Sequence, residues 1–227
     1  LHLNFDAFRR LGIGRGRAEL RFLGIGEAVV VMGPTGRPSE IRGGENVLLV
    51  GGGLGNAVLF SIAKAFRAAG SRVLYFAGYR DGGTVFERDQ IEAGPAQEIW
   101  APRAGGPSRV RLDLTARVLA MGSDGMMRAG AEARKGALAP YLSPAHVALG
   151  SINSPMQCML KEVCAQCLQR HVDPVTGEET LVYSCFDQDQ ELDRVDFAHL
   201  RQRLRQSSMQ EKLSALWFEE RLPRAAE

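Results

Sequence analysis

The sequence lacks any uninterrupted apolar run close to the roughly 18 residues that a membrane-spanning helix needs. Its first residues also lack the basic stretch followed by an apolar one that marks a secretory signal. Neither sign of charge dominates, because 28 Lys and Arg face 26 Asp and Glu, and this balance argues against nucleic-acid binding. We therefore expect a cytoplasmic protein without membrane or nucleic-acid partners, and 45% hydrophobic residues are enough for a substantial core.

Cysteine is also scarce, and the four that are present lie in one short segment. They are Cys158, Cys164, Cys167 and Cys185. This clustering is too tight for disulfides that would staple a chain of 227 residues, and it suits the ligands of one metal centre. Gaps of five, two and seventeen residues let one loop supply three thiolates and a later strand supply the fourth. This three-plus-one plan is typical of plant-type 2Fe-2S centres.

Two other interpretations of the cysteines stay open. Structural zinc also takes four thiolates, but its usual pattern is two compact pairs, whereas Cys158 and Cys185 each stand alone. Ordinary buried thiols are the second alternative. A Rieske centre is disfavoured because it needs two histidines beside the cysteines, and only His171 is near. We expect His171 to lie at the surface.

Short apolar runs alternate with helical patterns from residue 46 to residue 149. Alternation of this kind predicts a parallel sheet and an α/β fold. The predicted strands are Asn46–Val50, Arg72–Ala77, Thr115–Ala120 and Val147–Leu149. Helices are predicted from about Val58 to Gly70 and from Met126 to about Leu138.

The C-terminal third has a different pattern. Asp173–Gly177 is a polar turn between two β-rich runs and predicts a hairpin. An amphipathic helix follows Asp196. Ser208 and Glu211 form a capping box, which predicts a second helix that buries its apolar residues. Those residues are Leu213, Leu216 and Trp217.

A glycine-rich turn joins the first strand to the first helix. It contains Gly51, Gly52, Gly53, Gly55 and Asn56. Bare backbone N–H groups at a helix N-terminus can approach a pyrophosphate, so this turn is a candidate nucleotide site. The full dinucleotide fingerprint is absent, because Asn56 stands where its third glycine belongs. A tight connection without a ligand is the alternative.

Ligands of open parallel sheets bind beyond the carboxyl ends of the strands. The residues expected at this edge are Tyr79, Arg80, Gly122, Ser123 and Asp124. Tyr79 and Arg80 could contact the adenosine ribose or a 2′-phosphate, or they could form a solvated turn. Arg80 and the neighbouring Asp81 favour opposite cofactors, so NADH and NADPH stay equally open.

Three segments in this order resemble the electron-transfer subunit of dihydroorotate dehydrogenase and its ferredoxin-reductase-like relatives, including modules fused to glutamate-synthase-like oxidoreductases. They are Val47–Gly55, Gly122–Met127 and Asn153–Cys158. The chain departs from the family pattern at the cysteines, because five residues rather than four separate the first two. The resemblance also implies that the segment from Gly122 to Met126 borders the nicotinamide.

The resemblance implies an FAD-binding barrel, then an α/β nucleotide-binding domain, then a small 2Fe-2S domain. We assign residues 1–43 to a barrel remnant or irregular N-terminus, 44–145 to the NAD(P)-binding domain, and 146–227 to the 2Fe-2S domain with C-terminal helices. Met32–Gly36 resembles the last strand of the barrel, whereas the family's flavin motif is not found.

The expected function is electron transfer from NAD(P)H through FAD to a 2Fe-2S cluster and on to a partner oxidoreductase of the dihydroorotate-dehydrogenase or glutamate-synthase type. Hydride carries two electrons whereas the cluster accepts one, so a flavin is needed between them. No side chain is expected to act as acid or base. One alternative is a nonredox nucleotide-binding or scaffold protein with structural zinc, and another is a truncated remnant that cannot oxidise a nucleotide.

Overall fold

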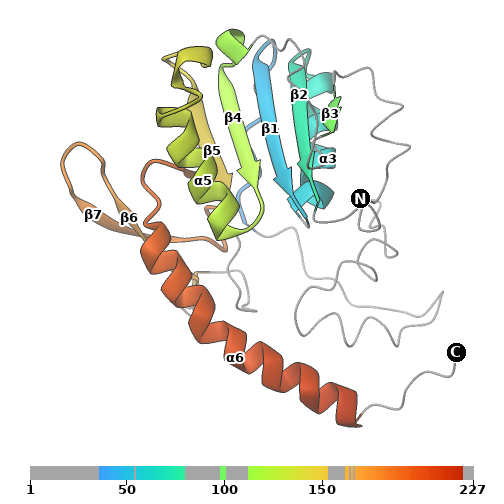
Figure 1. Ribbon diagram of the computed structural model, residues 1–227, viewed down its shortest axis with the longest axis vertical. Coiled ribbons are helices and arrows are strands. Elements are labelled where there is room, and N and C mark those ends of the chain that lie inside the picture. Colours follow the sequence, from blue (N-terminus) through green and yellow to red (C-terminus); the bar gives the residue numbers. More distant parts are fainter. Residues whose placement is uncertain are drawn as a thin grey trace, which may run out of the picture.

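The largest element of the described structure is a six-stranded sheet, which is flanked by helices (Figure 1). The computed structural model describes residues 36–53, 55–79, 98–100, 112–152, 162–163, 165 and 167–221. The strands lie in the order β3-β2-β1-β4-β5-β8. Their bounds are β1 Asn46–Gly52, β2 Arg72–Gly78, β3 Glu98–Trp100, β4 Arg117–Met121, β5 Val147–Ser151 and β8 Asp189–Glu191. All pairs are parallel except β5 with β8, which confirms the predicted α/β class with a mostly parallel sheet.

Helices cover both faces of the sheet. On one face, α3 (Gly55–Ala68) buries Leu59 and Phe66 against β1 and β2. On the other, α5 (Asp124–Lys135) contributes Met127 to a second core that also receives Leu200 from the next helix. Strands buried on both faces read as continuous apolar runs, and this is why the sequence locates them well. Two short 3-10 turns, Leu112–Leu114 and Ala139–Tyr141, connect these elements.

The predicted hairpin is present. It consists of β6 (Leu168–Val172) and β7 (Glu179–Tyr183), which pair antiparallel. The Asp173 carboxylate accepts hydrogen bonds from the backbone N–H groups of Val175 and Thr176, at 2.9 and 3.0 Å, and so closes the turn. After the hairpin the chain returns to the sheet as β8. The sheet thus continues past residue 146, where the sequence divides the nucleotide-binding part from the cysteine-bearing part.

The C-terminal region is one helix, α6 (Phe197–Arg221), and not the two that the sequence predicts. No glycine or proline interrupts these 25 residues, so the capping-box pattern at Ser208 lies inside a continuous helix. The predicted burial is also wrong, because Leu213, Leu216 and Trp217 are 60%, 61% and 56% exposed. Figure 1 shows the helix running away from the sheet. Among the described residues, no helix combines the length and apolar character needed to cross a bilayer.

Candidate nucleotide and cysteine sites

The four glycines where β1 passes into α3 have close neighbours at three positions and a left-handed backbone conformation at the fourth. A Cβ on Gly51 would lie 1.8 Å from the Asn56 side-chain oxygen, and one on Gly55 would lie 2.1 Å from the Met121 carbonyl oxygen. Gly53 instead has a φ of +55° and nothing within 4 Å of a Cβ. Its N–H donates to the Gly78 carbonyl oxygen at 2.9 Å. The turn is therefore held against β2 and β4 while its tip stays open.

Asn56 fastens this turn from within. Its side chain is fully buried. The amide Nδ2 donates to the carbonyl oxygens of Gly53 and Gly78, at 3.1 and 3.4 Å, and Oδ1 accepts from the Tyr75 hydroxyl at 2.8 Å. These bonds join the turn to β2 and use both ends of the amide. A glycine at this position could make none of them, which gives the departure from the dinucleotide fingerprint a physical reason.

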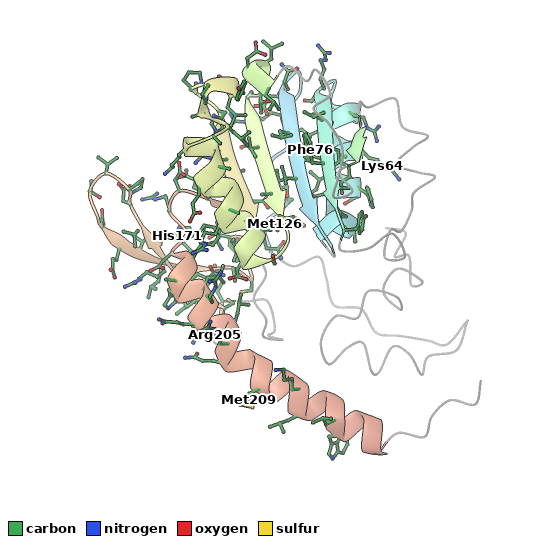
Figure 2. The ribbon with its side chains drawn as sticks, viewed as in Figure 1. Lys64, Phe76, Met126, His171, Arg205 and Met209 are labelled. Atoms are coloured by element: carbon green, nitrogen blue, oxygen red, sulfur yellow. The ribbon has the colours of Figure 1, made fainter. Side chains whose placement is uncertain are left out.

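The predicted segment after β4 meets the glycine turn at one edge of the sheet. The register pairs Gly51 with Met121, so β1 and β4 end side by side. The Met126 thioether lies between them: a Cβ on Gly52 would be 2.4 Å from its sulfur, and one on Gly122 would be 2.7 Å from its methyl carbon. Figure 2 shows Met126 at the end of α5 that faces the tips of these strands. The structure thus brings these predicted residues together.

Ser123 and Asp124 begin helix α5. The Ser123 hydroxyl accepts a hydrogen bond from the Met126 backbone N–H at 3.2 Å and so caps the helix. The Asp124 carboxylate accepts from Arg201 Nε of α6 at 3.0 Å. Sequence reasoning misses Arg201, because it is 77 residues away and has no motif around it. Tyr79 packs half-buried against the first core, and Arg80 lies outside the described residues.

Two of the four predicted cysteine ligands are described, and they flank one hairpin. Cys167 precedes β6 and Cys185 follows β7, and both are buried. The ladder pairs Leu168 with Tyr183, so Cys167 lies opposite Ser184. The Ser184 hydroxyl and N–H donate to the Cys167 carbonyl oxygen at 3.0 and 3.3 Å. Cys158 and Cys164 lie outside the described residues, as does most of the Asn153–Cys158 segment.

The described half of the donor set has the chemistry of a thiolate metal centre. Both described thiols are buried, and they flank one hairpin, with Cys167 just before β6 and Cys185 just after β7. Glu162 and Ala165, on either side of Cys164 in sequence, have left-handed φ values of 58° and 56° that suit a tight loop. Within the described part of the chain, no three or more His, Cys, Asp or Glu side chains form a metal-binding group. The four-cysteine site stays a prediction.

His171 is buried, and its predicted surface position is therefore wrong. His171 and Gln169 lie two positions apart on β6, and both are buried. The His171 Nε2 lies 2.7 Å from the Gln190 side-chain oxygen of β8. A polar residue on a strand can face either side, and only the pairing partner decides which.

No family model matches the chain. An uncharacterized protein of Rickettsia prowazekii (strain Madrid E) is 27% identical over 208 residues, which cover 89% of this chain and 23% of that protein. A Thermotoga maritima homolog of the dihydroorotate dehydrogenase B (NAD(+)) electron transfer subunit is 45% identical over 69 residues, 30% of this chain and 24% of that protein. The chain thus spans about a quarter of the length of these curated relatives.

Among solved structures, the NADH-dependent reduced ferredoxin-NADP oxidoreductase, studied for flavin-based electron bifurcation, matches with a TM-score of 0.70 and 27% identity. The match covers 91% of this chain and 74% of that one. Together with the mostly parallel sheet, these likenesses support a ferredoxin-reductase-like relationship for this chain.

Proposed function

We propose that this chain is an electron-transfer module that takes electrons from NADH or NADPH and delivers them, through a flavin and a 2Fe-2S cluster, to a partner oxidoreductase. The observation that supports this most is the meeting of the glycine turn with the Gly122–Met126 segment at the carboxyl edge of a parallel sheet. Ligands of such sheets bind at this edge. The solved structure with 27% identity and a TM-score of 0.70 belongs to an NADH-dependent oxidoreductase, which agrees with the proposal.

In the proposed nucleotide site, the open tip of the turn receives the pyrophosphate. Gly53 leaves room for its approach, and the N-terminus of α3 favours negative charge there. The other residues of the turn are not proposed to contact the pyrophosphate but to keep the turn in shape. They are Gly51, Gly52, Gly55 and Asn56. Gly122 to Met126 border the nicotinamide, and Tyr79 and Arg80 face the adenosine side.

The proposed cluster ligands are Cys167 and Cys185, together with Cys158 and Cys164 outside the described residues. A 2Fe-2S centre would supply one-electron acceptance, which is why a flavin is included between hydride donor and cluster. The chain's own contribution is to keep two thiols buried and to fix their backbone through Ser184. The flavin is expected from the family resemblance, whereas the family's flavin motif is not found in residues 1–43.

The proposed partner is a catalytic oxidoreductase subunit or domain, of the dihydroorotate-dehydrogenase or glutamate-synthase type. The Thermotoga maritima relative is named as an electron transfer subunit homolog, and such a subunit works with a separate catalytic one. Since the chain spans about a quarter of that relative, the partner's substrate is part of the proposal and is not fixed by the likeness.

The test is an anaerobic absorbance spectrum with iron, sulfide and zinc analysis of the purified chain and of Cys185→Ser. We expect about two irons and two sulfides per chain, with visible bands that the variant loses. Val163→Ser is a control, because Val163 is 80% exposed, lies next to Cys164 in sequence and has no ligand role. Zinc without sulfide would overturn the electron-transfer proposal and favour a zinc-stabilised scaffold.

A further inference from the structure

The chain segment that enters the sheet from the N-terminal side lies against the turn that carries Cys185. Gly36 has a φ of +77°, and a Cβ there would be 3.1 Å from the Cys185 carbonyl oxygen. The Arg37 backbone N–H donates to the Phe186 carbonyl oxygen at 2.8 Å. These contacts join residues about 150 positions apart in the chain. The close approach leaves room only for a small residue at position 36.

The Arg37 side chain extends the same contact. Its Nη1 lies 3.1 Å from the Asp187 carboxylate oxygen, and its guanidinium carbon lies 5.1 Å from the centre of the Phe186 ring. A planar guanidinium can pair with a carboxylate and stack on a ring at once, which an ammonium group cannot do equally well. One arginine therefore holds both residues that follow Cys185.

The turn also has hydrogen bonds of its own, and Gln190 Nε2 donates to the Asp187 carbonyl oxygen at 2.9 Å. The N–H groups of Phe186 and Asp187 both donate to the Tyr183 carbonyl oxygen, at 3.0 and 2.9 Å, and these bonds reverse the chain after β7. Cys185, at this turn, is buried. Arg37 is 66% exposed and belongs to neither apolar core, so the fold does not need it for core packing.

We propose that Arg37 is a positioning residue for the Cys185 ligand of the iron-sulfur centre, an inference that rests on the proposed function. Partners that orient a ligand without touching the metal govern metal retention and redox potential. Arg37 acts through the Phe186–Asp187 backbone by holding the Cys185 thiol in its buried orientation. In sequence it directly follows Met32–Gly36, the predicted last strand of the flavin barrel, so it would also link the flavin region to the cluster turn.

The test compares Arg37→Met and Arg37→Lys with a matched control, Arg42→Met. Arg42 lies on the same segment and makes an exposed ion pair of its own, with Glu40 at 2.8 Å. Each anaerobically purified protein is titrated for its midpoint potential by electron paramagnetic resonance, and iron release to a chelator is timed. Arg37→Met should release iron about 10-fold faster, with a shifted potential and altered resonance line shape, and Arg37→Lys should restore part of the difference.

A measurement without metal tests the positioning role of Arg37 separately from the proposed cluster. In the cluster-free chain, alkylation of Cys185 by iodoacetamide is followed by peptide mass spectrometry, and Arg37→Met should accelerate it while thermal unfolding stays unchanged. If Arg37→Met matches Arg42→Met in potential, iron release and alkylation, the positioning role is wrong even when the wild type holds a cluster. If the wild type binds no iron and sulfide, the proposed function fails first, and the cluster role of Arg37 fails with it.

Discussion

Replacing Gly55 by alanine should destabilise the protein strongly, because the new methyl group would meet backbone and not a movable side chain. It would lie 2.1 Å from the Met121 carbonyl oxygen and 2.5 Å from the Met121 carbonyl carbon, whereas real Cβ atoms essentially never come closer than 3.0 Å. The start of α3 must therefore shift by about 1 Å away from β4 in a close-packed core. We expect the free energy of unfolding to fall by about 3 kcal/mol and the melting temperature by about 6–12 °C.

Gly53→Ala is the companion change, and it should separate stability from binding. Gly53 has nothing within 4 Å of a Cβ, so only its left-handed φ of +55° opposes the substitution, at a cost of about 1 kcal/mol. The methyl group would instead enter the space proposed for the pyrophosphate. Affinity for NADH or NADPH should then fall at least about tenfold, which corresponds to about 1.4 kcal/mol.

Urea unfolding followed by circular dichroism measures the first quantity, and calorimetric titration with NADH and with NADPH measures the second. If Gly55→Ala is no less stable than Gly53→Ala, the packing argument for the turn is refuted. If Gly53→Ala folds and binds both nucleotides like the wild type, the turn is a plain strand-to-helix connection and the proposed nucleotide site is lost.

Three further predictions concern stability. Gly130→Ala, in an exposed helical position with open space around the new Cβ, should raise the free energy of unfolding by about 0.5–1 kcal/mol in urea titrations; a loss would contradict the helical geometry of α5. Leu216→Ser should change the free energy of unfolding by less than about 0.5 kcal/mol, because Leu216 is 61% exposed. Leu49→Ala in the core should lower it by about 2–5 kcal/mol. Equal losses for the two variants would mean that α6 is buried in solution. Although burial raises the pKa of the Asp196 carboxyl, hydrogen bonds from the His199 N–H and the Arg170 guanidinium lower it overall. The stabilisation from these bonds is therefore present above about pH 4 and is lost as the pH falls through the lower folded-state pKa. The urea midpoints of wild type and Asp196→Asn should converge in acid, and a gap that stays constant down to about pH 3 would refute this.

The elements that the sequence predicts well are those whose signal is local. Val47 to Val50 is an apolar run buried on both faces, and such a run is recognised without knowing its neighbours. The turn at Asp173 is likewise local, since its side chain bonds to residues two and three positions on. The glycine turn belongs here too, although the sequence alone does not reveal that Asn56 supports it from inside.

The elements that the sequence misses depend on distant partners. β8 contains Asp189, Gln190 and Glu191, a polar triplet with no strand signal, and it becomes a strand only because β5 offers an open edge. Gln190 is buried there beside His171, so both polar residues satisfy each other across elements. The sequence predicts two helices in place of α6 because a capping pattern at Ser208 cannot be distinguished, in sequence, from a serine inside a helix.

These long-range contacts bear on how the two proposed centres are coupled. A relay of electrons requires a fixed separation, whereas domains joined by a linker move relative to one another by default. Here the cysteine-bearing part is tied to the nucleotide-binding part by strand pairing and by two ion pairs: β5 pairs with β4, Asp193 pairs with Arg134 of α5, and Arg201 of α6 pairs with Asp124. Arg134 also lies 3.0 Å from His146 Nε2, which extends the second link to the loop before β5. Because Asp124 starts the helix proposed to border the nicotinamide, the third link joins that site directly to α6. These contacts therefore favour a rigid arrangement of the proposed nucleotide and cysteine sites, which an electron relay through an intervening flavin would need.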